Sequence, residues 1–389
     1  MKAYQQKDIE HTFLQEKAEN WFEKGLLPQT QLDAIKKEFP LDYYQPNFFL
    51  RIALFLFMSL VCTFSIAILW LIFEKAIQQS PTLTLSILSF AFGVGLVAVL
   101  EHFIKYQKMF YAGTDNALLY YGIASFSTAI LTAFDAQHLP TWLALLLILP
   151  VFLIAIVRYA DSLTVCGTYI ISLTIVFDAS LSFSAGKTLL PFIIMLFSFG
   201  IYRLSEKLRK RKDVLYYANV LDILKTLSLT TFYLGGNYFI VREGNALVNK
   251  IYTGSTQIAF APLFYFFSVM IPILYVVGGL KKKDRLLLFM GLLCAAFSVF
   301  TYRHYFGFLP TEIALIISGT LLIVVCAGLI YYLKTPKFGF TYNPESERDG
   351  ISLESILLSE IIQTKLDTDE KTFRFGGGTS GGGGAGGEY

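Results

Sequence analysis

The chain has 389 residues, of which 54% are hydrophobic and only 16% are charged. A soluble globular domain usually carries about a quarter charged residues, and it could not hide 36 Phe and 23 Tyr side chains without leaving large apolar patches. Composition therefore excludes an ordinary soluble protein and favours an integral membrane protein, with the lipid bilayer as its main partner. The formal net charge of +3 gives no reason to expect nucleic acid as a partner.

The segment 1–48 contains no uninterrupted apolar stretch of the kind that marks a secretory signal peptide. Its apolar residues recur at helical spacing instead, at Ile9, Phe13, Leu14, Trp21 and Phe22, and again at Leu32, Ile35 and Phe39. Gly25 suits the end of a first helix, and Pro28 suits the first turn of a second. The pattern predicts a two-helix N-terminal arm over 1–48. Because so short a segment rarely holds a core alone, we expect the arm to dock on the membrane domain or on a partner.

A helix needs roughly 20 mainly apolar residues to cross a bilayer. Ten runs approach this within a transmembrane domain predicted over 49–334, at 52–73, 82–103, 116–134, 140–157, 163–183, 189–203, 214–240, 257–280, 285–302 and 309–333. The sixth run is short and the seventh contains charges, so whether these two cross fully is left open. The sequence predicts an all-α protein, a polytopic transmembrane helical bundle with about ten spans.

Lys and Arg are distributed unevenly over the loops between these runs. If residue 1 lies in the cytoplasm, 20 basic residues fall in the arm and the cytoplasmic loops, and five fall in the opposite loops. Because basic residues mark the cytoplasmic side, the sequence predicts cytoplasmic N- and C-termini. The densest cluster lies in the 203–212 loop, where attraction to anionic lipid is compatible with a role in topology.

The chain becomes polar again after the last run. Over 335–375 we expect a cytoplasmic tail, in which Ser352 could cap a short helix that ends near Thr364. The segment 376–389 is mostly glycine, and such a segment cannot bury enough surface to offset its ordering entropy. We therefore expect this last segment to be disordered.

Two short motifs each occur twice, with nearly the same separation along the chain. Asp115 begins DNALLYYG and Asp284 begins DRLLLFMG, while Leu-Pro-Thr opens both the 140–157 run and the 309–333 run. Proline in a first helical turn is ordinary by itself, but two matches on equivalent hairpins, whose separations agree to within one position, indicate a duplication. The separation between the two copies spans six helices. Because six is an even number, both copies have the same orientation in the membrane. The first four spans would repeat as the last four, in a parallel arrangement that some secondary transporters use.

The 214–240 run carries two ionisable residues, Asp222 and Lys225. Each such group costs roughly 2.5 to 3.5 kcal/mol at mid-membrane, so its presence needs a reason. Three positions apart, the two could pair across one helical turn, and the same part of the helix carries Asn219, Thr226 and Thr230. Either this polar stripe lines a substrate, ion or proton site, or the two charges form an internal pair that holds the helix against its neighbours.

Asp178, toward the outer end of the 163–183 run, is a further candidate for an intramembrane polar site. His138 and His304 lie in outward loops, and two histidines do not make a metal site. No nucleophile elbow, P-loop, zinc-protease or dinucleotide motif is present. The sequence therefore indicates no catalytic residues, no cofactor and no metal ligands, and a membrane-embedded enzyme is the least favoured class.

The arm segment WFEKGLLPQTQLDAI resembles the N-terminal signature of bacterial membrane proteins grouped as domain of unknown function 2157. The residues that carry the resemblance are Trp21, Gly25, Leu26, Leu27, Gln29, Gln31 and Ile35. The resemblance covers this part of the arm and the general architecture, and not the rest of the chain. It implies a polytopic protein of a bacterial inner membrane without an established activity, and it assigns no catalytic residue.

Two functions remain in competition. The repeat and the buried charges favour a transporter-like or permease-like protein with a polar site on the 214–240 helix. The alternative is a non-catalytic membrane scaffold or envelope assembly factor, which recruits partners through its arm and tail. A transporter should place Asp222 and Lys225 on a solvated cavity near mid-membrane, whereas a scaffold should bury them dry and mutually paired.

Overall fold

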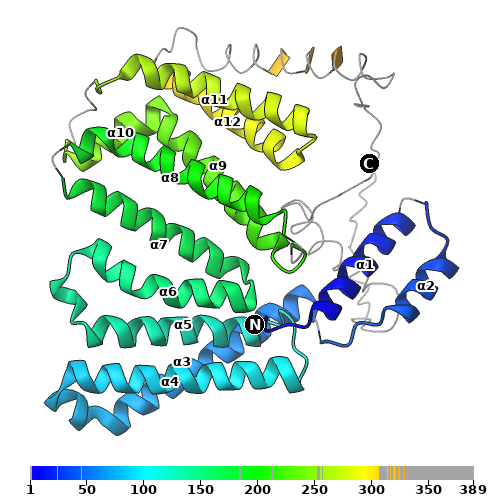
Figure 1. The fold of residues 1–389 in the computed structure, drawn as a ribbon, viewed down its shortest axis with the longest axis vertical. Coiled ribbons are helices and arrows are strands. Elements are labelled where there is room, and N and C mark those ends of the chain that lie inside the picture. Colours follow the sequence, from blue (N-terminus) through cyan, green and yellow to red (C-terminus); the bar gives the residue numbers. More distant parts are fainter. Residues whose placement is uncertain are drawn as a thin grey trace, which may run out of the picture.

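The computed structural model describes residues 2–305 apart from 24, 45, 184, 212–213, 252–254 and 256, together with isolated positions between 313 and 331. Helices α1 (Gln6–Glu23) and α2 (Gln29–Glu38) form a hairpin beside a helical bundle (Figure 1). The bundle comprises α3 (Phe48–Gln79), α4 (Pro81–Tyr106), α5 (Thr114–Ala133), the 3-10 turn η1 (Ala136–His138), α6 (Thr141–Tyr159), α7 (Ser162–Leu181), α8 (Gly186–Leu208), α9 (Ala218–Gly236), α10 (Tyr238–Val248), α11 (Ala261–Lys282) and α12 (Arg285–Tyr305).

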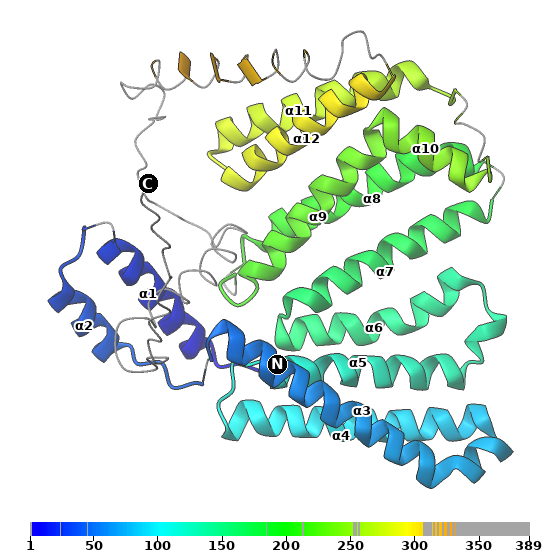
Figure 2. The same ribbon diagram turned by 180° about the vertical axis from the view of Figure 1, so that it is seen from behind.

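The long bundle helices run in alternate directions, so that their turns gather at two ends (Figures 1 and 2). We call the end next to α1 and α2 the arm side, and the opposite end the far side. The α4–α5, α6–α7, α8–α9 and α11–α12 turns lie on the arm side, whereas the α3–α4, α5–α6 and α7–α8 turns lie on the far side. The loops predicted to share one side of the membrane therefore do share one end of the bundle.

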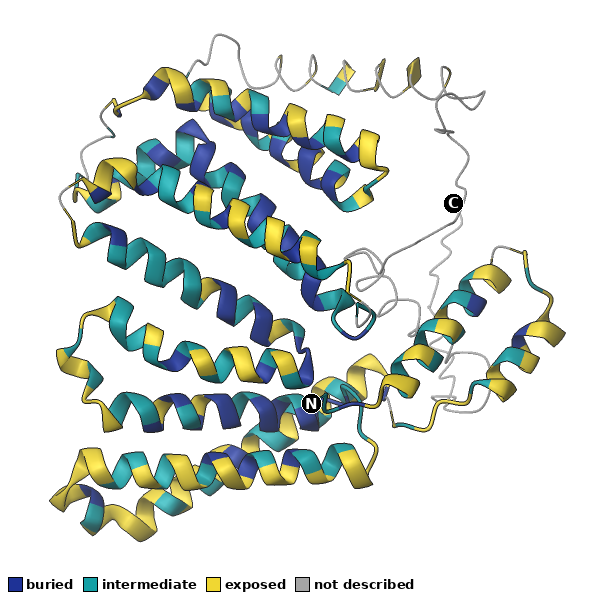
Figure 3. Cartoon of the chain, in the orientation of Figure 1, coloured by how far each residue is buried: buried dark blue, intermediate teal, exposed yellow. Residues whose placement is uncertain are grey.

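Seven of the described helices are long and apolar enough to cross a membrane, namely α3, α4, α6, α7, α8, α11 and α12. Helices α5 and α9, with 20 and 19 residues, are long enough but more polar. Ten residues of α5 and nine of α9 are buried, against two of 32 in α3 (Figure 3), so these helices face protein on several sides and need less apolar surface. The tenth run, 309–333, lies mostly outside the described residues, so the number of ten stays a prediction.

The runs 189–203 and 214–240, whose full crossing of the membrane was left open, form helices of different kinds. Helix α8 has 23 residues, longer than the 189–203 run, which gives it a length of about 35 Å. The 214–240 run does not form one helix, because α9 ends at Gly236 and α10 begins at Tyr238. Between them Asn237 has an extended backbone, and its Oδ1 accepts hydrogen bonds from Phe239 N and Ile240 N at 3.0 and 3.3 Å. That side chain caps α10 and fixes the break.

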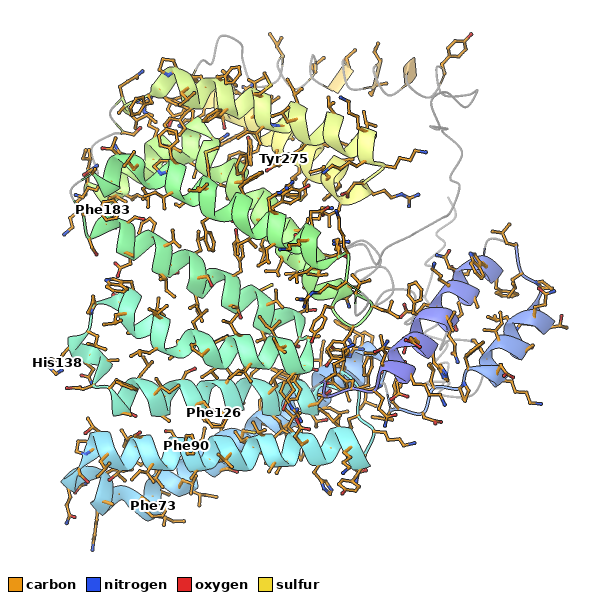
Figure 4. All side chains as sticks on the ribbon, in the orientation of Figure 1. Phe73, Phe90, Phe126, His138, Phe183 and Tyr275 are labelled. Atoms are coloured by element: carbon orange, nitrogen blue, oxygen red, sulfur yellow. The ribbon has the colours of Figure 1, made fainter. Side chains whose placement is uncertain are left out.

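Two of the four hydrophobic clusters in the described residues join most of the bundle helices. The first joins α3 to α6 through Cys62, Leu96, Leu100, Leu118, Leu119, Ile123, Ala155 and Tyr159. The second joins α8, α9, α11 and α12 through Met195, Leu229, Tyr233, Ile271, Tyr275, Leu287, Met290 and Cys294. Figure 4 labels Tyr275 in the second cluster, and beside the first it labels Phe90 and Phe126, whose rings pack edge to face across α4 and α5 at 5.6 Å. Helix α7 lies between the clusters and contacts α6, α8 and α9.

The aspartates of the repeated motif occupy similar places in two hairpins. Asp115 lies in the first turn of α5, and Asp284 directly precedes α12. Leu118 and Leu287, which follow these aspartates at the same position of the motif, are 1% and 5% exposed and belong to different hydrophobic clusters. The second Leu-Pro-Thr, at 309–311, lies outside the described residues. The duplication therefore stays a prediction, to which these positions add support.

Candidate functional site

The charged residues of α9 lie near its arm-side end. The helix begins at Ala218, so that Asp222 and Lys225 are four and seven residues from its start, ~6 and ~10 Å along its axis. A start near 214, as assumed from the sequence, would have placed them about one turn deeper. Both side chains are buried, with Asp222 5% and Lys225 4% exposed. Buried charges need partners, and the structure supplies them from other helices.

Each of the two charges pairs with a residue outside α9. Asp222 Oδ1 accepts a hydrogen bond from Arg209 Nη2, directly after α8. Lys225 Nζ donates to Asp284 Oδ2 in the α11–α12 turn, and it lies 3.1 Å from Glu206 Oε1 in the last turn of α8. We call these five residues the charge cluster. The cluster ties together the arm-side ends of α8, α9 and α12.

The expected mutual pair between Asp222 and Lys225 is therefore not the arrangement found. Their spacing permits a contact across one turn, but Asp222 pairs with Arg209 directly after α8, and Lys225 pairs with carboxylates in α8 and in the α11–α12 turn. The last turn of α8 and the α11–α12 turn both approach α9 here, and they bring one cation and two carboxylates of their own. Pairing between helices is favoured because Arg209, Glu206 and Asp284 lie within ion-pair distance of the two buried charges.

Asp284 makes contacts with two helices, α9 and α12. Its Oδ1 accepts a hydrogen bond from Leu287 N at 3.1 Å, which caps the first turn of α12. Burial by itself would raise the pKa of Asp284, but the hydrogen bond and the charge of Lys225 outweigh burial and hold that pKa below its usual value. Asp284 is therefore ionised at neutral pH, and its bond to Lys225 is charge-assisted.

The remaining residues of the polar stripe are satisfied mainly by their own helix. The Thr226 hydroxyl donates to the Asp222 carbonyl oxygen at 2.8 Å, and the Thr230 hydroxyl donates to the Thr226 carbonyl oxygen at 2.9 Å. Such bonds to the preceding turn need neither a ligand nor water. Asn219 differs, because its buried Oδ1 has no hydrogen-bond partner in the described part of the chain.

Asp178 belongs to a different place. Its Oδ2 accepts a hydrogen bond from Trp142 N at 2.9 Å and so satisfies a free N–H group in the first turn of α6. This contact lies on the far side, whereas Asp222 and Lys225 lie on the arm side. The structure does not bring Asp178 together with the other candidate residues.

Three members of the charge cluster were not singled out from the sequence as site residues. Arg209 was interpreted as part of a topology signal, Asp284 as part of the repeat, and Glu206 was not considered. A usable signal was present, because Glu206 and Asp284 are carboxylates within strongly basic segments. Such carboxylates are candidate partners for the buried cation of Lys225, because a buried charge needs a partner.

The arm is attached to the bundle at both of its ends. Ala3 N donates to the Arg158 carbonyl oxygen at 2.9 Å, and the Tyr4 hydroxyl donates to Asp115 Oδ2 at 3.1 Å. Burial and the neighbouring Asp115 raise the pKa of Tyr4 well above its usual value, so this hydroxyl remains a donor. At the other end, Tyr44 N donates to the Lys108 carbonyl oxygen at 2.8 Å. The expected docking of the arm on the membrane domain is thus made through its ends.

The tip of the arm is the turn between α1 and α2. Gly25 has a φ of +68°, and Leu26 N donates to the Trp21 carbonyl oxygen at 2.9 Å, as in a Schellman motif. Gly25 therefore ends α1 as predicted, whereas Pro28 is the residue before α2 and not part of its first turn. Trp21, Phe22 and Leu26 are 40%, 38% and 66% exposed at this tip. All three lie in the segment that carries the family resemblance, and Trp21 and Leu26 are among the residues that match it.

Comparison with protein-family models, with curated proteins and with solved structures finds no match for this chain. The resemblance of the arm to domain of unknown function 2157 therefore stays a prediction. Within the described residues, no group of three His, Cys, Asp or Glu side chains is placed to hold a metal ion. The class of protein follows from the fold, whose several long apolar helices make this a multi-pass helical membrane protein.

Proposed function

We propose that this chain is a non-catalytic membrane scaffold that presents the tip of its arm to a protein partner. One observation carries the proposal: the arm is attached at both ends, yet Trp21, Phe22 and Leu26 remain exposed outside the long apolar helices. Lipid accounts for exposed apolar residues on the bundle, but not for these. Exposed apolar side chains that gather at one turn outside the membrane-spanning helices support an interaction site, and tryptophan is enriched among the residues that dominate binding energy.

The attachment of the arm favours binding of this kind. A segment held at two points loses less conformational freedom when a partner binds, so more of the contact energy is available for affinity. The partner chemistry that fits is an apolar pocket deep enough for the Trp21 ring, with room for Leu26 beside it. The orientation that accompanies the proposal has the arm side in the cytoplasm of a bacterial inner membrane, because the basic loops gather at that end.

Site-specific photo-crosslinking in intact cells tests the proposal. A photoreactive phenylalanine analogue is placed at Trp21, at Leu26 or at the control position Lys37, which is exposed on α2 away from the tip. We expect one discrete product from both tip positions and none from the control, and we expect Leu26→Asp to remove the product formed from position 21. Identical products from all three positions, or no product from the tip, would contradict the proposal.

A transporter-like function is the second candidate, and a specific observation favours it. Beside the charge cluster, Asn219 Oδ1 is buried without a hydrogen-bond partner in the described part of the chain. Polar atoms of this kind could bind a transported ion or its water. As a scaffold, the chain in proteoliposomes should pass protons and alkali cations no faster than empty liposomes. Flux that Asn219→Leu abolishes would favour the transporter instead.

A further inference from the structure

The structure brings together two basic segments that are far apart in the sequence. Around the end of α8 lie the exposed cations Arg203, Lys207, Lys210 and Arg211, and around the α11–α12 turn lie Lys281, Lys282, Lys283 and Arg285. The Lys225–Asp284 ion pair connects the two segments through α9. Lys282 Nζ also donates to the Tyr202 hydroxyl of α8 at 3.3 Å. We call these eight cations the basic surface.

The concentration of these cations exceeds what membrane topology requires. Orientation needs only an excess of basic residues on one side. The α4–α5 turn contributes two, Lys105 and Lys108, and next to the α6–α7 turn Arg158 is paired with Glu101 at 2.6 Å. In the basic surface, by contrast, eight cations converge on two adjoining turns, while the carboxylates of the charge cluster are taken by Arg209 and Lys225. A surface with this density of basic residues has a positive potential that attracts anions.

Apolar stripes on the same helices lead up to these cations. On α8, Leu196 and Phe199 are 73% and 48% exposed, and helical spacing places them on the face that continues to Arg203. On α11, Leu274 is 59% exposed, and it lies two turns before Lys281 on the same face. The basic surface therefore sits where two apolar helix faces end. In a membrane protein that position is the boundary between acyl chains and head groups.

We propose that the basic surface binds the phosphate head group of an anionic phospholipid, with the acyl chains lying along the exposed faces of α8 and α11. Both basic segments contribute to one site, which the ion pairs of the charge cluster assemble. The cations are exposed at the ends of apolar stripes, an arrangement that suits a lipid phosphate better than a soluble one, which would gain nothing from the stripes. The inference rests on membrane insertion and does not depend on the scaffold function.

Native mass spectrometry of the full-length protein in mild detergent tests this inference. The protein is titrated with phosphatidylglycerol or with phosphatidylcholine of the same chain length, and the bound lipids are counted. The test variant combines Lys207→Gln with Lys281→Gln, one change in each basic segment. The control variant combines Lys105→Gln with Lys108→Gln, which removes the same charge from the same side of the membrane.

Each basic residue near a head group is worth about fivefold in affinity for an anionic lipid. We therefore expect phosphatidylglycerol to bind the test variant about 25-fold more weakly than the parent, and each single change to weaken it about fivefold. The control variant should change affinity less than about twofold, and replacing Lys207 and Lys281 by Arg should retain binding. Thermal unfolding without added lipid should be unchanged in all variants, because the replaced side chains are exposed.

Three results would overturn the inference. Equal retention of phosphatidylglycerol by the test and control variants would place any lipid site elsewhere. Equal binding of phosphatidylcholine and phosphatidylglycerol by the parent would remove the role of head-group charge. Displacement of phosphatidylglycerol by inorganic phosphate at millimolar concentration would assign the basic surface to a soluble anion and not to lipid.

Discussion

Replacing Lys225 by methionine leaves the half-buried Asp284 without its cationic partner. Breaking a buried ion pair by removing one partner costs about 3–5 kcal/mol, because the surviving charge stays uncompensated. Two features place this case near the lower end, at about 3 kcal/mol: the Asp284 side chain is 20% exposed, and it keeps its hydrogen bond from Leu287 N. Such a loss is a large share of the stability of most folded domains.

The choice of second change identifies the true partner. Adding Asp284→Asn to Lys225→Met removes the stranded charge and keeps the cap on α12, so we expect it to recover at least half of the lost stability. Adding Asp222→Asn instead strands Arg209, so the two losses should add. A double-mutant cycle should accordingly give a coupling energy above about 1.5 kcal/mol for Lys225 with Asp284, and under about 0.5 kcal/mol for Lys225 with Asp222.

The assay is reversible unfolding of the detergent-solubilised protein by SDS, at several pH values. The pKa of Asp284 is lower in the folded protein than in the unfolded chain, where it is about 3.9. The ion pair of Asp284 with Lys225 therefore stabilises the parent fully above about pH 3.9, and this stabilisation is lost as the pH falls through the folded-state pKa. In Lys225→Met the sign reverses, because protonation neutralises the stranded carboxylate, so that variant should gain stability between pH 7 and 4. Parent-like unfolding of Lys225→Met, or rescue by Asp222→Asn and not by Asp284→Asn, would refute the assigned pairing.

Four further outcomes can be checked. Gly291→Ala should cost about 1–3 kcal/mol in the same unfolding assay, because the added Cβ would lie 2.8 Å from a backbone nitrogen of α11. The control Gly95→Ala, whose added Cβ has no atom within 4 Å, should change stability by less than about 0.5 kcal/mol. Asp178→Ala should cost about 1 kcal/mol through the lost cap on α6. Tyr4→Ala should release one attachment of the arm and speed tryptic cleavage within it; an unchanged rate would argue against docking through this residue. A cysteine at Lys210 should be labelled by a membrane-impermeant reagent only after permeabilisation, and labelling in intact cells would contradict the orientation.

The fold could be predicted from sequence to the extent that it depends on local composition. The boundaries of α4, α6 and α12 lie within a few residues of the predicted runs, because apolar length decides them. The end of α9 was missed, although Gly235-Gly236-Asn237 carries a signal: glycines weaken a helix, and Asn is a good cap for the next one. An apolar window cannot register such a break, since the residues after it are also apolar.

The candidate site could be predicted only in part, for a related reason. Asp222 and Lys225 stand out because charges are rare in apolar helices. Their partners do not stand out, because Arg209 and Asp284 lie in polar turns where charges are common. Pairing across one turn can be read from spacing, but pairing between helices depends on which helix ends meet. That information lies in the tertiary fold and not in any local segment of the sequence.

The order in which the paired residues are synthesised has a consequence for membrane insertion. Arg209 precedes its partner Asp222 by 13 residues, but Lys225 precedes Asp284 by 59. At synthesis rates of about 5–20 residues per second, Asp284 is added roughly 3–12 s after Lys225. During that interval Lys225 has Glu206 but lacks Asp284 as a partner, and α9 is less apolar than the flanking long helices. The stable integration of α9 therefore depends on synthesis of the α11–α12 hairpin. In a nascent chain that stops before Asp284, α9 should integrate poorly into the bilayer.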